Sequence, residues 1–296
     1  MIEAALKIVP SAFPFSGTLG HLLVRHFIDN PIFLVGCGRS GTSVLVQALN
    51  QHPGILAGRH EAPLYQYIGE IAFVYSEGPV ADYFQDTTRI PANDLRCRLR
   101  RLCFESLWGN SFGLRAHLAN LKQDPKAFLN TQYWLGKAFP LEEQARGLQW
   151  LFPRAKFIHI YRNGIEVVAS MSRFGWFKTQ DFETRCRFWA DRVGYYAYLR
   201  RRHNALTIRH EDFLLQPAQE LETVQRFLRL SVDSGPTDYA SSTIVHPRGQ
   251  PTRKGNPKQE ILSRTPSWHS WSAQQREMFR TICADAMREL AYEVPF

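Results

Sequence analysis

The stretch Pro31-Ile-Phe-Leu-Val-Gly-Cys-Gly-Arg-Ser-Gly-Thr-Ser43 decides how the rest of the chain is interpreted. Its uninterrupted apolar run, 32–35, predicts a short strand buried on both faces of a parallel sheet. The glycines that follow predict a turn in which the backbone can approach a ligand closely. Thr42 or Ser43 then opens a helix, whose N–H groups and dipole favour an anion. The stretch therefore predicts a site for phosphate or sulfate.

This loop nearly matches the nucleotide-triphosphatase pattern G-x-x-x-x-G-K-[ST], because Gly36 and Gly41 have the required spacing. Thr42 occupies the position of the lysine that contacts the β- and γ-phosphates, so ATP hydrolysis is not expected. The cation lies instead inside the loop, at Arg39. The alternative is a strand–glycine–helix turn that binds nothing.

The composition indicates a folded protein that binds anions. The chain has 296 residues, 44% hydrophobic residues and a net charge of +9, which excludes an intrinsically disordered chain. The positive charge suits a polyanionic cofactor, an acidic acceptor, a nucleic acid or a membrane surface. Nucleic acid is the weaker interpretation, because no basic helical region and no aromatic RNA-binding motif is present.

Cysteine usage and hydropathy indicate a cytoplasmic protein with reduced thiols. The five cysteines are scattered, odd in number and without metal-ligand spacing. No apolar stretch reaches the roughly 18 residues that a membrane span requires. The first 14 residues lack the regions of a secretory signal, and no Asn-x-Ser/Thr acceptor sequence occurs.

A second strand–turn–helix corner is predicted further along the chain. Residues 155–161 are rich in β-formers, Arg162-Asn163-Gly164 turns the chain, and a helix with Ser170 follows. This corner again presents a cation and helix N–H groups to an anion.

Together these segments resemble sulfotransferases that use 3′-phosphoadenosine 5′-phosphosulfate (PAPS). The resemblance is carried by Gly-x-Gly-Arg-Ser-Gly-Thr-Ser at 36–43, by Asn50-Gln-His-Pro53 and by Phe152-Pro-Arg-Ala-Lys-Phe-Ile-His-Ile-Tyr-Arg-Asn-Gly-Ile-Glu-Val-Val-Ala-Ser170. The pattern is most similar to bacterial and Golgi-type enzymes, including tyrosylprotein sulfotransferases. It implies a P-loop-NTPase-like α/β fold in three layers, α/β/α, with a central parallel sheet.

The resemblance covers most of the chain from Pro31 to Phe296, so we expect one domain over 1–296. Residues 1–30 are expected to be a peripheral lead-in, and 65–122 a helical insertion that shapes the acceptor site. A strand is expected at 127–129 and helices at 181–202 and 217–230. Residues 231–266, rich in Pro, Gly, Ser and Thr, predict a long loop.

The resemblance also implies how the cofactor is held. The 36–43 loop would hold the 5′-phosphosulfate, with the guanidinium of Arg39 gripping it bidentately. A second set would bind the 3′-phosphate: Arg162, Ser170 and the Arg-Lys-Gly element at 253–255. The expected cofactor-binding residues are Gly38, Arg39, Ser40, Gly41, Thr42, Ser43, Arg162, Ser170, Arg253, Lys254 and Gly255. An exposed basic loop remains the alternative for 253–255.

Sulfuryl transfer needs alignment, a base for the acceptor hydroxyl and positive charge at the leaving oxygen. A strand at 55–57 delivers the charged cluster Gly58-Arg-His-Glu-Ala-Pro63 to the same edge of the sheet as the loop. Glu61 is the expected base, and His60 remains an alternative because the family glutamate is offset by about one residue. The resemblance assigns Lys137 to the leaving group. The acids of His210-Glu-Asp-Phe213 are expected to pair with arginine or to cap turns.

The expected activity is transfer of the sulfuryl group of PAPS to an acceptor hydroxyl or amine, with 3′-phosphoadenosine 5′-phosphate (PAP) as product and no metal. The arginines and the lysine take the role that Mg²⁺ has in kinases. Two alternatives remain: a P-loop kinase-like phosphotransferase and a non-catalytic nucleotide-binding protein. The acceptor, whether small molecule, glycan or peptide, and the oligomeric state are open at this point.

Overall fold

The structure is a computed structural model that describes residues 29–110, 130–245, 253–263 and 265–296. The predicted lead-in, apart from Asp29 and Asn30, and the strand expected at 127–129 lie outside the described residues. Gly136 and Lys137 themselves lie in a strand, Tyr133–Lys137, which begins with an aromatic and apolar run.

Five parallel strands form the central sheet in the order β2-β3-β1-β4-β5. They are β1 (Pro31–Val35), β2 (Ile55–Glu61), β3 (Tyr133–Lys137), β4 (Lys156–Tyr161) and β5 (Ala205–Arg209). The first predicted strand is therefore the middle strand, with a neighbour on each side. The expected parallel α/β fold is confirmed.

The side chains of β1 alternate between two cores. Ile32 and Leu34 pack among α3 and α13 side chains, whereas Phe33 packs edge-to-face on Trp134 of β3 in the opposite core. All five residues of β1 are buried, as an apolar run without polar alternation predicts for a strand covered on both faces.

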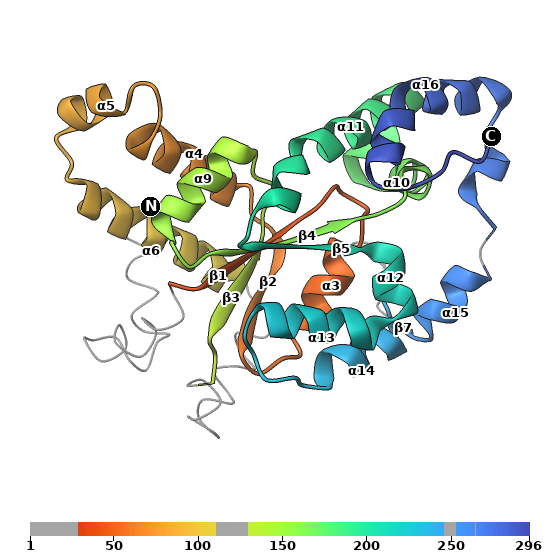
Figure 1. The fold of residues 1–296 in the computed structure, drawn as a ribbon, viewed down its shortest axis with the longest axis horizontal. Helices are drawn as coiled ribbons and strands as arrows, with labels where there is room; N and C mark the ends of the chain where they lie inside the picture. The colour runs from red at the N-terminus through yellow and green to blue at the C-terminus, as the bar shows by residue number, and fades with distance from the viewer. Residues whose placement is uncertain (1–28, 111–129, 246–252, 264) are drawn as a thin grey trace.

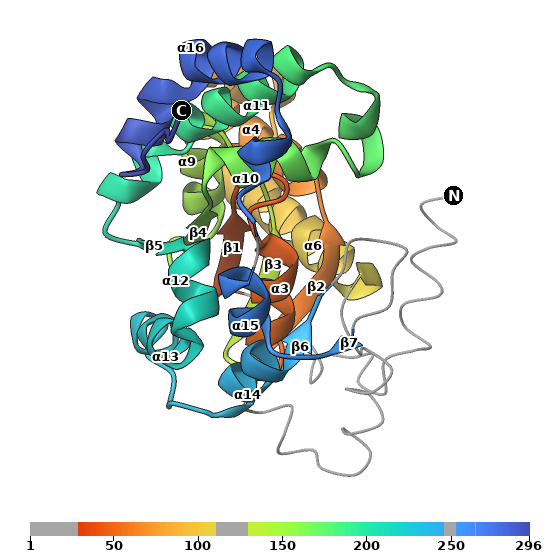
Figure 2. The same ribbon diagram turned by 90° about the vertical axis from the view of Figure 1, so that its right-hand side faces the viewer.

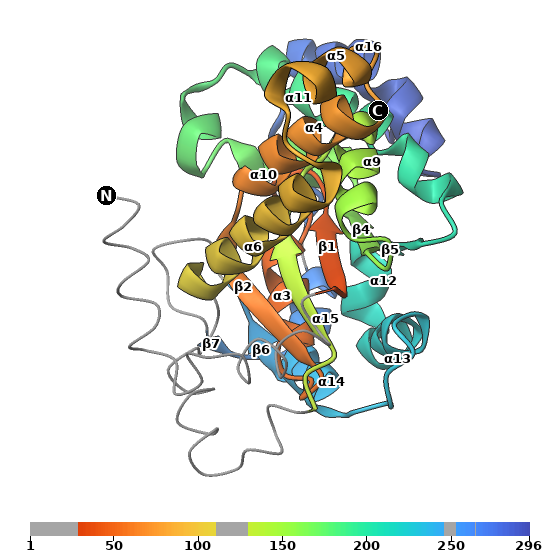
Figure 3. The ribbon, with the colours of Figure 1, turned by 90° about the vertical axis from the view of Figure 1, so that its left-hand side faces the viewer.

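Helices cover both faces of the sheet, which gives the predicted three layers. Figure 3 shows one face with α4 (Leu64–Ser76), α6 (Ala92–Asn110) and α9 (Glu142–Leu151) in front of the strands. Figure 2 shows the opposite face, where α3 (Thr42–Leu49), α13 (Pro217–Phe227) and α14 (Gly235–Ser242) lie. Helix α5 (Ala81–Thr88) connects α4 and α6, so the described part of 65–122 is helical as predicted.

A third apolar cluster lies beyond the carboxyl end of β4. It is formed by α10 (Gly164–Met171), α11 (Phe182–Tyr195) and α16 (Ala273–Glu289), which Figure 1 shows together at the upper right. Because α10 begins directly after β4, this cluster places the C-terminal helix beside the second predicted anion corner. The remaining elements are short: η1 (Gly175–Thr179), η2 (Ala197–Arg201), α12 (His210–Leu215), β6 (Thr243–Ile244), β7 (Arg253–Lys254), α15 (Pro257–Leu262) and η3 (Ser267–Ser270).

Two sequence-based expectations were wrong in detail. The segment 231–266 is not one loop, since it contains α14, α15 and the antiparallel pair β6–β7. Pro236 and Pro257 lie in the first turns of the two helices, where a missing N–H does no harm, and the side chain of Asn256 caps α15. The helix expected over 181–202 ends at Tyr195 and continues as the 3₁₀ turn η2. None of the described helices has the length and apolarity needed to cross a bilayer.

Candidate active site

The loop between β1 and α3 has the backbone of an anion site. Arg39 has φ 76° and Gly41 has φ 95°, both left-handed, and the Ser40 N–H donates to the Cys37 carbonyl at 3.1 Å. A left-handed non-glycine residue is strained, and such strain is common at ligand-binding sites. Helix α3 has no side-chain cap and no acidic residue in its first turn. Its first N–H groups and dipole are therefore suited to an anion.

Gly41 also packs against a side chain that follows β5, the edge strand of the sheet. A Cβ at this position would lie 2.2 Å from Cδ2 of His210, which is buried at the start of α12. The sequence-based prediction gave the loop glycines two roles, a special backbone conformation and close approach of the backbone to a ligand. The structure adds a packing role, because the imidazole of His210 packs directly against Gly41 and leaves no room for a side chain there.

We expect Gly41→Ala to destabilise the fold by about 2–4 kcal/mol, through an unfavourable φ and a clash, and to abolish any nucleotide binding at this loop. Gly175→Ala is the matched control, since Gly175 also has positive φ (57°) but no atom lies within 4 Å of its added Cβ. Chemical denaturation and nucleotide titration of both variants test this. Equal losses in the two variants would contradict the packing role of His210.

Ser40 is the loop residue whose side chain is most enclosed. It has no exposed surface, and no described residue forms a hydrogen bond with its Oγ. It lines a small cavity with Cys37, His159 and Arg162. Burial lowers the pKa of His159 to about 3, so the ring is neutral. Burial raises the pKa of Cys37 to about 12, so this thiol packs as a small apolar residue and is not a nucleophile.

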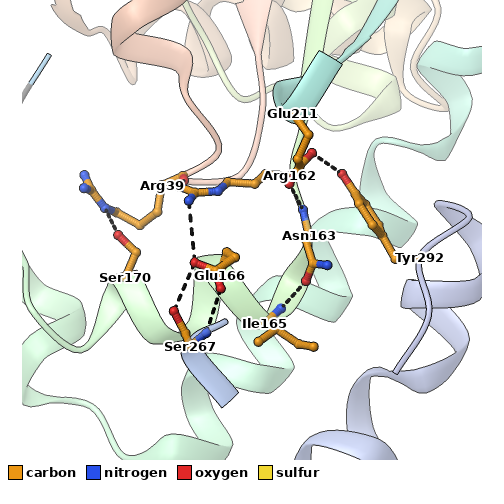
Figure 4. A network of polar contacts seen from close by, with 9 residues as sticks. All are labelled: Arg39, Arg162, Asn163, Ile165, Glu166, Ser170, Glu211, Ser267 and Tyr292. Atoms are coloured by element: carbon orange, nitrogen blue, oxygen red, sulfur yellow. Dashed lines mark hydrogen bonds and ion pairs between the residues drawn. The ribbon is translucent and has the colours of Figure 1, made fainter. Parts of the chain in front are cut away.

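Arg39 and Ser170, predicted from separate segments, are in direct contact. The Arg39 Nε donates to the Ser170 Oγ at 3.2 Å (Figure 4), and its guanidinium stacks on the ring of Phe174 at 4.4 Å. The contact joins residues 131 positions apart in the sequence. The two predicted halves of the cofactor site, the loop and the β4–α10 corner, therefore face one another.

Arg162 ties the same two segments together. Its Nη1 donates to the carbonyl oxygen of Arg39 at 3.2 Å, and its Nη2 lies 3.8 Å from a carboxylate oxygen of Glu166 (Figure 4). Glu166 is itself held by Ser267, whose N–H and Oγ donate to its two oxygens, each at 3.0 Å. Glu166 therefore helps to orient the guanidinium of Arg162, the residue that was predicted to bind an anion.

The corner after Arg162 is fixed by a second carboxylate. The Asn163 Oδ1 caps α10 by accepting from the Ile165 N–H at 2.9 Å, and the Asn163 N–H donates to Glu211 at 3.1 Å. Glu211 also lies 3.7 Å from the guanidinium of Arg209. This is the structural role that the sequence predicted for the acids after β5.

The expected catalytic residues lie at the opposite side of β1. Lys137, the last residue of β3, is buried and pairs in register with Leu34 of β1. Its carbonyl oxygen accepts from the Ala62 N–H at 3.1 Å, and its backbone also pairs with Glu61 of β2. The backbone of 59–61 is described, and it extends β2 beyond the predicted end at 57. Glu61, Lys137 and the loop thus share one edge of the sheet, as predicted.

The triplet 253–255 is placed by local contacts. Arg253 forms a 3.2 Å ion pair with Glu260, β7 pairs with β6, and the Gly255 N–H donates to the Ser242 carbonyl at 3.0 Å. These contacts belong to the α14–α15 region. A role of the triplet at the 3′-phosphate remains a prediction.

The sequence analysis missed Glu166, Ser267 and Tyr292, whose hydroxyl donates to Glu211 at 2.6 Å. Glu166 was detectable, because its i, i+4 spacing from Arg162 brings opposite charges together on a helix. Ser267 and Tyr292 gave no local signal. Among the described residues, no group of His, Cys, Asp and Glu side chains could hold a metal ion.

Comparison with known proteins assigns the fold to a family. A family profile described as "Sulfotransferase family" matches residues 31–234. The chain belongs to the sulfotransferase family. Together, family and fold support sulfuryl transfer as the general chemistry of this transferase. No curated protein matches the chain.

Solved sulfotransferase structures share the architecture at low identity. The sulfotransferase domain of the Synechococcus PCC 7002 olefin synthase matches with a TM-score of 0.50 and 16% identity, over 90% of this chain and 96% of that one. Mouse sulfotransferase SULT7A1, solved with PAP, matches with a TM-score of 0.47 and 17% identity, over 91% and 88%. A sulfotransferase from Alicyclobacillus acidocaldarius matches with a TM-score of 0.44 and 18% identity, over 88% and 96%.

Proposed function

We propose that this sulfotransferase moves the sulfuryl group of PAPS to an acceptor hydroxyl or amine and releases PAP. The observation that carries the proposal is the 3.2 Å contact between Arg39 and Ser170. The sequence resemblance assigns these residues to the two phosphate-bearing ends of PAPS. Their contact places the guanidinium of Arg39 and the hydroxyl of Ser170 side by side, where one ligand with two anionic groups can reach both.

The residues of the loop fit an anionic group on physical grounds. The first turn of α3 is uncapped and free of acids, and the enclosed Ser40 hydroxyl has no partner among the described residues. Arg39 can grip two oxygens with its planar fork. Thr42 is buried in α3 and carries no charge, so a lysine contact to nucleoside triphosphate is lacking. These features favour PAPS over ATP.

The proposed chemistry divides the work between the two sides of β1. PAPS supplies the sulfuryl group and leaves as PAP. Glu61 accepts the proton of the acceptor, with His60 as the alternative, while Lys137 and Arg39 stabilise the charge that develops on the leaving oxygen. Arg162, Ser170 and the 253–255 triplet hold the 3′-phosphate. No metal is needed in this scheme, because the cations of the chain provide the positive charge.

The five cysteines are free thiols, and four of them are buried. This supports the proposal that the enzyme works in the cytoplasm, where thiols stay reduced. The acceptor class stays open among phenols, sugars, amines and peptide tyrosines.

The test is a screen of these acceptor classes with PAPS, in which PAP release is measured. We expect acceptor-dependent PAP formation without added metal. Turnover of ATP with Mg²⁺ in place of PAPS would contradict the proposal and favour the phosphotransferase. Tight PAP binding without turnover on any acceptor would favour the non-catalytic alternative.

A further inference from the structure

The C-terminal segment contacts the 3′-phosphate corner through a tyrosine outside the part of the chain that matches the family. Tyr292 follows α16, well beyond residue 234, where the family match ends. Its hydroxyl donates to Oε2 of Glu211 at 2.6 Å (Figure 4). The contact brings residues 81 positions apart together at the start of α10.

Glu211 links Tyr292 to the corner, because its two oxygens accept hydrogen bonds from both. Its other oxygen, Oε1, accepts from the Asn163 N–H at 3.1 Å, and the Asn163 Oδ1 caps α10. Because a carboxylate has two oxygens in one plane, fixing Oε2 fixes the direction of Oε1. The Tyr292 hydroxyl therefore influences the position of the peptide that follows Arg162.

The tyrosine is itself held firmly. It is buried, with the Arg209 guanidinium 4.5 Å above its ring and the ring of Tyr161 edge-on at 6.0 Å. Burial, and then the Glu211 charge, raise the pKa of Tyr292, so its hydroxyl stays protonated and donates. An aromatic ring packed on two sides leaves the hydroxyl little freedom to move.

The contact also has an electrostatic consequence. A carboxylate close to an anion site repels the anion, and this repulsion grows as water is excluded. The guanidinium of Arg209 partly balances the charge of Glu211, and the hydroxyl of Tyr292 stabilises that charge by a hydrogen bond. Without the hydroxyl, Oε2 of Glu211 loses a hydrogen-bond donor, so the carboxylate is held less firmly and its charge is less well stabilised.

We propose that Tyr292 is a positioning residue for the phosphate bound at the Arg162–Gly164 corner, acting through Glu211 and Asn163. The inference rests on the proposed function, because it takes this phosphate to be the 3′-phosphate of PAP. It adds a segment outside the matched region to the cofactor site. Tyr292 itself does not touch the reacting atoms.

The test compares the affinities of PAP and 5′-AMP, which differ only in the 3′-phosphate, by calorimetric titration. For Tyr292→Phe we expect the Kd of PAP to rise about five- to tenfold. This is less than the loss of a direct hydrogen bond to a charged group would cause, because Tyr292 acts on the phosphate through two other residues. The Kd of 5′-AMP should change less than about twofold, because that ligand lacks the group being positioned.

Tyr239→Phe is the matched control. It removes a hydroxyl that donates to Gln47 at 2.6 Å, on α14 and away from the corner. Glu211→Ala removes the oxygen that accepts from the Asn163 N–H, at the other end of this series of contacts. If Tyr292 acts through Glu211, the ratio of the Kd of 5′-AMP to that of PAP should be no lower in the double variant than in Glu211→Ala alone.

The outcomes separate the inference from the proposed function. If the wild-type protein binds PAP more tightly than 5′-AMP and Tyr292→Phe keeps that ratio, the inference is wrong and the function stands. An equal loss for both ligands, together with a lower Tm, assigns Tyr292 a purely structural role and also overturns the inference. If the wild-type protein does not distinguish the two ligands, the proposed function fails, and the inference with it.

Discussion

Replacing Glu61 by glutamine is expected to lower kcat about 10²–10⁴-fold, the usual effect of removing a general base. The backbone of Glu61 pairs with that of Lys137 at the loop edge of the sheet, which is where the proposed function brings the acceptor oxygen to the sulfuryl group. Glutamine keeps the size of the side chain but cannot take the proton. Steady-state kinetics with an acceptor found by screening measure the effect, and the Kd of PAP should stay within about twofold.

His60→Gln is the control that separates the two candidate bases. If Glu61 is the base, this neighbouring substitution should leave kcat within about fivefold. The reverse result, a large loss for His60→Gln and a small one for Glu61→Gln, would assign the proton transfer to His60. Similar small losses in both variants would show that neither residue is the base.

Replacing Lys137 by methionine is expected to lower kcat about 10²–10³-fold, as removal of one charge-stabilising group does in other enzymes. Lys137 is 5% exposed at the end of β3, beside β1 and β2. A buried ammonium is costly unless its charge is used or compensated. Methionine fills the same space without the charge. Because negative charge develops on the leaving oxygen only in the transition state, kcat should fall more than the affinity for PAP.

Lys156→Met provides the matched control for this substitution. Lys156 lies at the opposite end of the sheet, as the first residue of β4, where it stacks on Phe227 at 4.9 Å. We expect kcat to change less than about twofold there, since a charge at the opposite end of the sheet is largely screened from the reaction. A kcat of Lys137→Met within about threefold of wild type would rule out its role at the leaving group.

The central part of the fold was predictable because its signals are local. The apolar run of β1 and the glycines after it lie within 13 residues and identify the strand, the loop and the start of α3. The same holds for β4, Arg162 and α10. In both places the hydrophobic pattern and the turn chemistry agree, which makes the local structure readable.

The errors in the predicted secondary structure came from residues that can occur in more than one kind of element. The Pro, Gly, Ser and Thr content of 231–266 was taken to indicate a loop. Pro236 and Pro257 lie instead in the first turns of helices, because the fixed φ of proline suits the start of a helix as well as a turn. The strand that contains Lys137 was not predicted over its own residues, although Tyr133-Trp-Leu135 has the aromatic and apolar character of a strand.

The contacts that hold the second corner could not be predicted. Ser267 reaches Glu166 across 101 positions and Tyr292 reaches Glu211 across 81. No periodicity or spacing connects residues so far apart. Only the packing of α16 against α11, within the third apolar cluster, brings the C-terminal segment to this corner.

Thermal unfolding with PAP, 5′-AMP or ATP with Mg²⁺ tests the central claim most directly, since it needs no acceptor. At a hundredfold excess over Kd, a bound ligand adds about 2.7 kcal/mol of stability, which raises the Tm of a domain of this size by about 5–10 °C. We predict that PAP alone gives this shift and that Arg162→Met abolishes it. An equal shift with ATP, or none with PAP, would contradict a PAPS-dependent sulfotransferase.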